Sequence, residues 1–246
     1  MLKIKEYIKV KSLEEAYTLN QNRNNRIIGG MLWLKMSRGQ VQKAIDLSEL
    51  GLDTIEETDE IFSIGCMATL RQLETHAGLN RYTDGAVKDC VGSIVGVQFR
   101  NLATVGGSIF GRFGFSDVLT LFLALDADVE LYHAGIVPLA EFVNRKRDRD
   151  ILVRVIVKKK PIRCVYLSHR NTKTDFPVLT CAMVRDETGV RAAVGARPGA
   201  AVLVSVADGD TVRAAQSLSF GGNMRAGADY RRHLAKVLLK RGLASL

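Results

Sequence analysis

The sequence lacks a long apolar run. No stretch of roughly 18 or more apolar residues occurs, which is the length that would suggest a membrane-spanning helix. The N-terminal stretch Met1–Lys11 alternates lysine with isoleucine and tyrosine and does not have the apolar core of a signal peptide. Of the 246 residues, 47% are hydrophobic and 25% charged, which is typical of a globular protein with a real core. We therefore expect a soluble, cytoplasmic protein that does not enter a membrane.

Cysteine is scarce, with four residues in the whole chain. No two of them form a CxxC pair, and no histidine lies near them at the spacing of a metal ligand. This pattern indicates neither a disulfide framework nor a zinc or iron–sulfur site on this chain. We expect no bound metal and four reduced, mostly buried thiols: Cys66, Cys90, Cys164 and Cys181.

Familiar catalytic motifs are also missing. No HExxH occurs, and none of the four histidines has a serine or cysteine partner at motif spacing. The sequence therefore predicts no catalytic acid, base or nucleophile, and the histidines are interpreted as surface or structural residues.

The formal net charge of +9 raises the question of nucleic-acid binding. The basic residues lie in separate clusters, such as Lys158–Lys160 and Arg231–Arg232, with few aromatic residues between them. An acidic partner or a dinucleotide is at least as good an explanation, and a solvated basic face is the simplest one. Nucleic-acid binding is accordingly the last-ranked hypothesis.

Apolar periodicity predicts a mixed chain of strands and helices. Ser12 with Glu15 three residues later indicates the start of a helix. The basic stretch Asn144–Asp150 has the composition of a boundary, after which an antiparallel run is expected. The predicted strands are residues 3–10, 26–28, 61–65, 128–132, 136–139, 151–158, 162–170, 179–186 and 190–196, and further helices are predicted at 69–76, 119–126 and 229–240.

Two glycine pairs are the candidate binding elements. The predicted strand Arg26–Ile28 runs directly into Gly29-Gly30, and a strand that ends in glycines lets backbone N–H groups approach a phosphate closely. An ordinary turn is the alternative explanation, and no Rossmann GxGxxG motif is present there. The second pair, Gly106-Gly107, lies between the hydroxyl residues Thr104 and Ser108.

Two further residues have open interpretations. Asp117 follows the second glycine pair by ten residues, and its carboxylate is suited either to accept hydrogen bonds from a polyol or to cap the helix that begins at Val118. Trp33, the only tryptophan, packs either against a bound ring system or in the core, and core packing is slightly favoured.

Several ordered segments together resemble the FAD subunit of molybdenum hydroxylases, the family of xanthine and carbon monoxide dehydrogenases. The resemblance covers nearly the whole chain, and the segments that carry it are IIGGMLWL (27–34), IGCMATLRQLE (64–74), VQFRNLATVGGSIFGRFGFSD (97–117), LALDADVEL (123–131), PLAEF (138–142), DILVRVIV (150–157), GARPG (195–199) and ADYRRHLAKVLLKR (228–241). It implies an α+β, PCMH-type fold similar to that of vanillyl-alcohol oxidase, with a FAD-binding domain at 1–145 (subdomains about 1–50 and 51–145) and a C-terminal domain of antiparallel sheet with helices at 146–246.

The resemblance also implies roles for particular residues. The two turns would bind the FAD pyrophosphate, Asp117 would bind ribityl or sugar hydroxyls, and Leu152 would lie near the adenine or isoalloxazine end. The flavin would take electrons from the 2Fe-2S clusters of a partner subunit, fed by a molybdopterin subunit, and pass them to NAD or another acceptor. The implied cofactor-binding residues are Ile27, Ile28, Gly29, Gly30, Met31, Leu32, Trp33, Leu34, Ala103, Thr104, Gly106, Gly107, Ser108, Phe110, Asp117 and Leu152.

The sequence departs from the family at three positions. Met31 and Leu32 stand where members usually carry hydroxyl or acidic side chains, so phosphate contacts would depend on backbone amides. Leu167 stands where many members carry a lysine near the flavin or nicotinamide. A flavin-free assembly or structural protein of the same fold and a free-standing flavoenzyme are the alternative functions.

Overall fold

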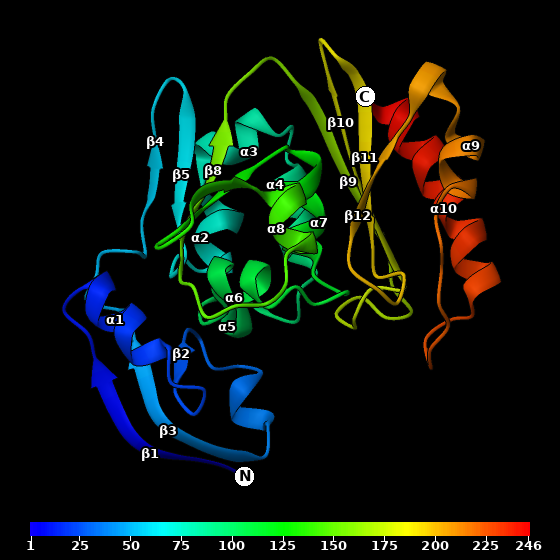
Figure 1. The fold of residues 1–246 in the computed structure, drawn as a ribbon. Helices are drawn as coiled ribbons and strands as arrows, with labels where there is room; N and C mark the ends of the chain where they lie inside the picture. Colours follow the sequence, from blue (N-terminus) through cyan, green and yellow to red (C-terminus); the bar gives the residue numbers. More distant parts are fainter.

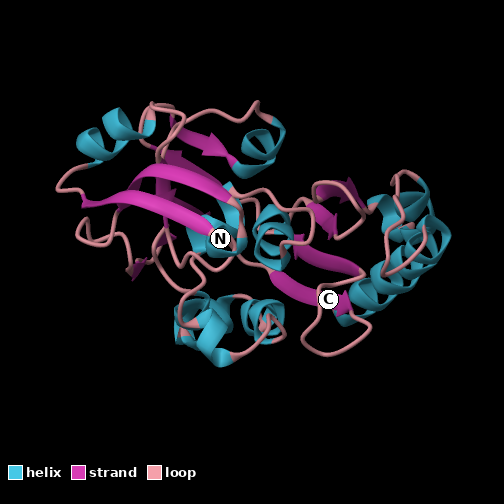
Figure 2. Cartoon of the chain, turned by 90° about the horizontal axis from the view of Figure 1, so that it is seen from below, coloured by secondary structure: helices cyan, strands magenta, loops and turns pink.

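The computed structural model describes residues 1–246 as an α+β chain with three separate β-sheets. In Figure 1 the chain runs from the blue N-terminal sheet, through a central region of short helices, to the red C-terminal helix at the opposite side. Seen from below in Figure 2, the C-terminal helices lie at the right-hand edge of the molecule, and strands fill its middle. The three sheets are described in chain order.

The N-terminal sheet has the strand order β1–β3–β2, and all of its pairs are parallel. Its elements are β1 (Leu2–Lys9), α1 (Leu13–Asn20), β2 (Arg26–Ile28), the 3-10 helix η1 (Leu34–Met36) and β3 (Gly39–Asp46). Ser12 caps α1, because its side chain accepts a hydrogen bond from the Glu15 N–H at 3.1 Å. The predicted cap and the predicted strand before Gly29 are both confirmed.

The middle sheet is antiparallel, with the strand order β4–β5–β8–β6–β7. Its strands are β4 (Ile55–Glu57), β5 (Ile61–Gly65), β6 (Asp128–Leu131), β7 (Gly135–Pro138) and β8 (Leu152–Lys158). The accompanying helices are α2 (Leu70–Thr75), α3 (Ala77–Tyr82), α4 (Ala86–Gly92), α5 (Val97–Arg100), α6 (Val105–Phe110), α7 (Asp117–Ala124) and α8 (Leu139–Asn144).

The position of β8 corrects one prediction. Residues 151–158 were expected to open the C-terminal antiparallel run, but β8 pairs with β5 on one side and β6 on the other, at the centre of the middle sheet. Its sequence is mostly apolar, and Val153, Val155 and Val157, at alternate positions, are buried. A domain boundary at residue 145 would cut through this sheet, so sheet membership favours a boundary after Lys158.

The C-terminal sheet is antiparallel, with the strand order β12–β11–β10–β9. The helices α9 and α10 pack against it from one side, and α4 and α7 of the middle region also contact it. Three of its strands and the final helix are where the sequence predicts them, whereas β12 was not predicted. The elements are β9 (Arg163–His169), β10 (Leu179–Asp186), β11 (Gly189–Gly195), β12 (Val202–Ser205), the 3-10 helix η2 (Ala207–Gly209), α9 (Thr211–Gln216) and α10 (Ala228–Ser245).

The apolar interior is divided into two cores. A cluster of 43 buried residues occupies mainly the first two parts of the chain, and a cluster of 14 lies between the C-terminal sheet and α9 and α10. All four cysteines are unpaired and buried, as predicted. None of the helices combines the length and the apolar character needed to span a bilayer. No group of three acidic, histidine or cysteine side chains is placed to hold a metal ion.

Candidate functional site

One large cavity of about 980 Å³ lies between the end of the N-terminal sheet, α6, the segment before β8 and the loop after β9. Its volume is at the upper end of the roughly 300–1,000 Å³ that is usual for ligand and cofactor pockets. All sixteen residues that the sequence assigns to cofactor binding line this cavity, from Ile27 to Leu152. Segments that are far apart in the sequence therefore meet at one cavity.

The loop after β2 supplies unpaired backbone donors. The N–H groups of residues 29–33 form no hydrogen bond within the protein. Met31 has φ of +59°, a left-handed conformation that non-glycine residues seldom adopt. Successive amides that include a left-handed residue form a concave anion site, so this loop is suited to a diphosphate. The side chains of Met31 and Leu32 add no hydrogen-bond donor to these amides.

Gly29 and Gly30 allow this loop to lie directly on the segment before α6. A Cβ atom on Gly30 would lie 1.8 Å from the Leu102 carbonyl oxygen, and one on Gly29 would lie 2.7 Å from Thr104 Oγ1. Any larger residue would separate the two loops. The first glycine pair is therefore needed for packing as well as for approach to a ligand.

The sequence predicted that the second glycine pair lies in a loop turn. In the structure, Gly106 and Gly107 belong instead to the first helical turn of α6. Thr104 caps this helix and accepts a hydrogen bond from the Gly107 N–H at 3.1 Å. The Gly106 N–H donates to the Cys66 carbonyl at 2.7 Å. These amides are already paired within the protein, so the two glycine pairs are not equivalent. A Cβ atom on Gly107 would have only Thr104 Oγ1 nearby, at 3.2 Å, so this position borders open cavity.

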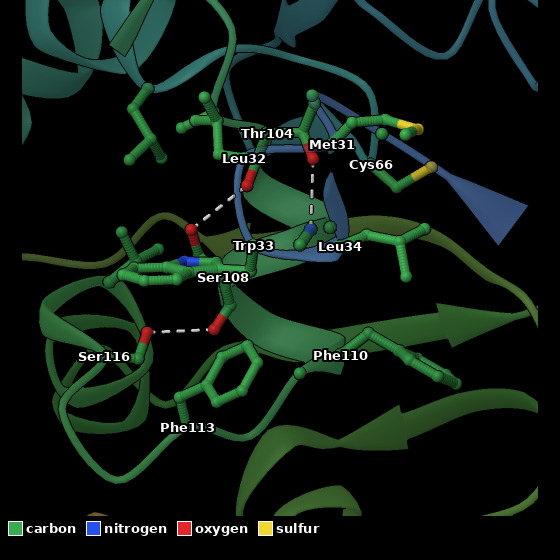
Figure 3. A pocket seen from close by; sticks show the side chains of 18 of the residues that line it. Met31, Leu32, Trp33, Leu34, Cys66, Thr104, Ser108, Phe110, Phe113 and Ser116 are labelled. Carbon is green, nitrogen blue, oxygen red and sulfur yellow. Dashed lines mark hydrogen bonds between the residues drawn. The ribbon is translucent and has the colours of Figure 1, made fainter. Parts of the chain in front are cut away.

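Two serines organise the wall beyond α6. Ser108 Oγ donates to the Thr104 carbonyl at 3.0 Å, and Ser116 Oγ donates to the Ser108 carbonyl at 2.9 Å. Figure 3 shows this chain of contacts, with Trp33 and Phe113 on one side of the cavity and Cys66 and Phe110 on the other. Burial raises the pKa of the Cys66 thiol to about 12, so this cysteine is a neutral part of the wall.

Asp117 joins the cavity to the C-terminal sheet. Ser116, rather than Asp117, caps α7, because Ser116 Oγ accepts the Leu119 N–H at 3.1 Å. Asp117 Oδ1 accepts hydrogen bonds from the Tyr166 hydroxyl, at 2.5 Å, and from the Arg170 guanidinium. Burial raises the pKa of Asp117, and the Arg170 charge opposes that shift. Its Oδ2 has no partner in the protein, so one oxygen remains for a ligand hydroxyl.

Aromatic side chains from three loops form one wall that the sequence did not predict as a unit. Trp33 is 42% exposed, so the slightly favoured interpretation of core packing is wrong. The ring of Trp33 lies 5.4 Å from that of Phe176 and 5.7 Å from that of Phe115, and Phe113 stacks on Phe115 at 5.2 Å. Such a wall is suited to a planar ring system. The repeated phenylalanines at 113 and 115 were its only local sequence signal.

Leu167 lies outside the cavity. Its side chain packs with the smaller core, between the C-terminal sheet and α10. The C-terminal part of the chain contributes Arg170 and the loop that carries Phe176 to the cavity wall instead.

A family model described as the FAD binding domain in molybdopterin dehydrogenase matches residues 2–159. The chain belongs to this family. Its domain is therefore an FAD-binding domain, and the predicted cofactor is confirmed. The match ends one residue after β8, which agrees with the position of that strand in the middle sheet.

One sequence relative and two solved structures are similar to this chain. The uncharacterized protein YgfM of Escherichia coli K12 is 25% identical over 196 residues, which cover 78% of this chain and 74% of YgfM. A carbon monoxide dehydrogenase structure from Hydrogenophaga pseudoflava has 21% identity and a TM-score of 0.85, covering 98% of this chain and 96% of that one. Quinoline 2-oxidoreductase from Pseudomonas putida 86 has 20% identity and a TM-score of 0.83 over the same shares. These structures confirm the predicted α+β fold of the flavin subunits.

Proposed function

We propose that the chain is the FAD-carrying electron-transfer subunit of a molybdenum hydroxylase. It takes electrons from 2Fe-2S clusters of a partner subunit and passes them to NAD or another acceptor. The observation that carries the proposal is the row of unpaired amides at residues 29–33 in the wall of the cavity where all sixteen predicted residues meet.

The residues of the cavity have separate tasks in this proposal. The amides of residues 29–33 bind the diphosphate, and Asp117 Oδ2 accepts a hydrogen bond from a sugar or ribityl hydroxyl. The aromatic wall around Trp33 excludes water from a ring system. When bound, FAD supplies the redox chemistry, and the protein contributes binding, orientation and electrostatics.

The partners in the proposal follow from the similar proteins. The Hydrogenophaga carbon monoxide dehydrogenase has a molybdenum cofactor, whose Mo-pyranopterin moiety is absent from that structure, and the Pseudomonas protein is a quinoline 2-oxidoreductase. We propose a 2Fe-2S subunit and a molybdopterin subunit as partners of this chain. The terminal acceptor in the proposal is NAD or another oxidant.

The cofactor assignment is tested by the absorption spectrum of the purified chain, with the released chromophore identified after heat denaturation. We expect flavin bands and released FAD. In the Gly107→Val variant, two methyl groups enter the cavity, and FAD should be lost while cooperative unfolding persists. Gly92→Val is the matched control, because a Cβ at Gly92 meets nothing within 4 Å. A wild-type chain that stays colourless and takes up no added FAD contradicts the proposal and favours a flavin-free assembly protein.

The electron-transfer assignment needs the assembled complex. A tagged chain purified from its native cells should bring molybdenum- and iron-containing subunits with it. In that complex, reducing substrate should bleach the flavin band, and NAD should restore it if NAD is the acceptor. A complex built with Gly107→Val should keep its molybdenum and iron but lose transfer to the acceptor. Isolation of the chain alone, with catalytic turnover of its own, would support the free-standing flavoenzyme instead.

A further inference from the structure

A group of arginines without carboxylate partners lies beside the cavity. Arg112 follows α6 directly, and Arg145 and Arg147 lie on residues 145–151, the segment between α8 and β8, which we call the strap. Arg147 lines the cavity, together with the rest of the strap from Asp148 onward. The hydrogen bonds of Arg112 and Arg147 go to backbone carbonyls and not to acidic side chains.

Crossed hydrogen bonds hold two of these guanidinium groups near one another. Arg112 Nη1 donates to the Arg145 carbonyl at 2.6 Å, and Arg147 Nη2 donates to the Gly111 carbonyl at 2.7 Å. Burial lowers the pKa of Arg112, and the positive charges of Arg147 and Arg145 lower it further, against the opposing charge of Asp148. The positive charges of these arginines repel one another, and a bound anion would relieve the repulsion.

Arg112 has two other unusual features. Its Nε is buried and has no hydrogen-bond partner. Its φ of +45° is in the left-handed region, where a side chain with a Cβ atom is strained. Unpaired donors and strained backbone are uncommon in proteins and tend to gather at functional sites.

The loop of residues 29–33 offers a bound diphosphate no full positive charge. Its amides carry only partial charges, and the side chains of Met31 and Leu32 cannot donate to a phosphate. A diphosphate has two negative charges, and guanidinium groups bind phosphate oxygens with paired donors. Gly111, to which Arg147 is bonded, lies in the same cavity wall as Gly107 and Ser108.

We propose that Arg147 and Arg112 form a cationic subsite for the diphosphate of a dinucleotide. Arg147 contacts the phosphate oxygens from the strap, and Arg112 supplies a second positive charge behind it. This inference rests on the proposed function. The diphosphate belongs either to FAD or to a nicotinamide dinucleotide acceptor, which share this chemistry, and the experiment distinguishes them.

The test is FAD binding to the full-length flavin-depleted chain, followed by flavin fluorescence at several salt concentrations. Arg147→Gln should weaken FAD binding about tenfold or more and reduce its dependence on salt, because one charged contact is lost. Arg147→Lys should recover part of the affinity, and Arg112→Gln should weaken binding in the same direction. Arg213→Gln is the matched control, because Arg213 is exposed on α9 and its side chain forms no hydrogen bond or salt bridge.

The outcomes separate the inference from the function on which it rests. Unchanged FAD affinity together with a raised dissociation constant for NADH in Arg147→Gln assigns the subsite to the acceptor. If Arg147→Gln and Arg112→Gln bind both dinucleotides as tightly as the wild type, the subsite is overturned and the proposed function stands. A wild-type chain that binds no FAD overturns the proposed function and the subsite with it.

Discussion

Asn20 and Arg149 exchange hydrogen bonds in both directions although they are 129 residues apart in sequence. Asn20 Nδ2 donates to the Arg149 carbonyl at 2.8 Å, and Arg149 Nε donates to the Asn20 carbonyl. Arg149 also donates to the carbonyls of Asn22, at 2.7 Å, and Asn25, at 3.0 Å. These contacts fasten the end of α1 and the approach to β2 to the strap. The same residues form one end of the cavity, so the pair fixes where the N-terminal loop lies relative to the middle sheet.

Replacing Arg149 with alanine should therefore loosen the N-terminal segment. Loss of charged hydrogen bonds to three carbonyls is expected to lower the free energy of unfolding by roughly 1.5–3 kcal/mol. The measurement is urea unfolding followed by circular dichroism, together with FAD affinity, which should fall as the cavity wall moves. Lys146→Ala is the control, because Lys146 is an exposed neighbour on the strap whose side chain makes no hydrogen bond or salt bridge. Equal stability of the two variants would contradict the role of Arg149.

Gly30→Ala should damage both packing and flavin binding. The added methyl group would lie 1.8 Å from the Leu102 carbonyl oxygen, so the loop after β2 must move away from the segment before α6. We expect a loss of roughly 1–3 kcal/mol in stability, as for other overpacked sites, and a clear loss of bound FAD. Gly92→Ala, in α4, should keep its FAD and be as stable as the wild type or more so. Retention of FAD by Gly30→Ala at wild-type affinity would disprove the close contact.

Trp33 offers a direct optical test of where the flavin lies. It is the only tryptophan of the chain and lines the cavity, so its emission reports on this site alone. Addition of FAD to the flavin-depleted chain should quench that emission strongly, because the indole and the bound ring system lie in one aromatic wall. Trp33→Phe should abolish the signal while FAD binding, followed by flavin fluorescence, persists. FAD uptake with unaltered tryptophan emission would place the flavin away from this wall.

Asp186 should make the C-terminal sheet sensitive to acid. Burial alone would raise its pKa, but hydrogen bonds from Thr188 and Lys160 and the charge of Arg191 hold the pKa of this carboxyl well below its usual value. A carboxyl with a lowered folded-state pKa stabilises the protein above its unfolded pKa of about 4, and that stabilisation is lost as the pH falls further.

The measurement is the free energy of unfolding as a function of pH. The wild type should lose stability as the pH falls below about 4, and Asp186→Asn should be less stable at pH 7 by roughly 1–3 kcal/mol. The variant should also show a shallower acid dependence than the wild type. Parallel pH curves for the two proteins would show that Asp186 does not contribute.

Several local elements and the family could be predicted from the sequence alone. Ser12 caps its helix through a bond to a residue three positions away, and Arg26–Ile28 form a strand that ends in glycine, because these features depend on neighbours in the chain. The ordered motifs around Gly30 and Gly107 also identified the family correctly.

The partners of these elements depend on contacts between segments that are far apart in the chain. The pattern of β8 fits any buried strand, and long-range pairing alone places it between β5 and β6. The two glycine pairs look alike in sequence. The amides of Gly106 and Gly107 donate to Cys66 and Thr104, whereas those of Gly29 and Gly30 form no hydrogen bond within the protein. Three features join segments that are far apart in the chain: the aromatic wall, the hydrogen bonds of Arg149 and the crossed hydrogen bonds of the arginines at the strap. In the aromatic wall, Trp33 and Phe176 are 143 residues apart. Their contacts depend on distances that a local residue pattern does not encode.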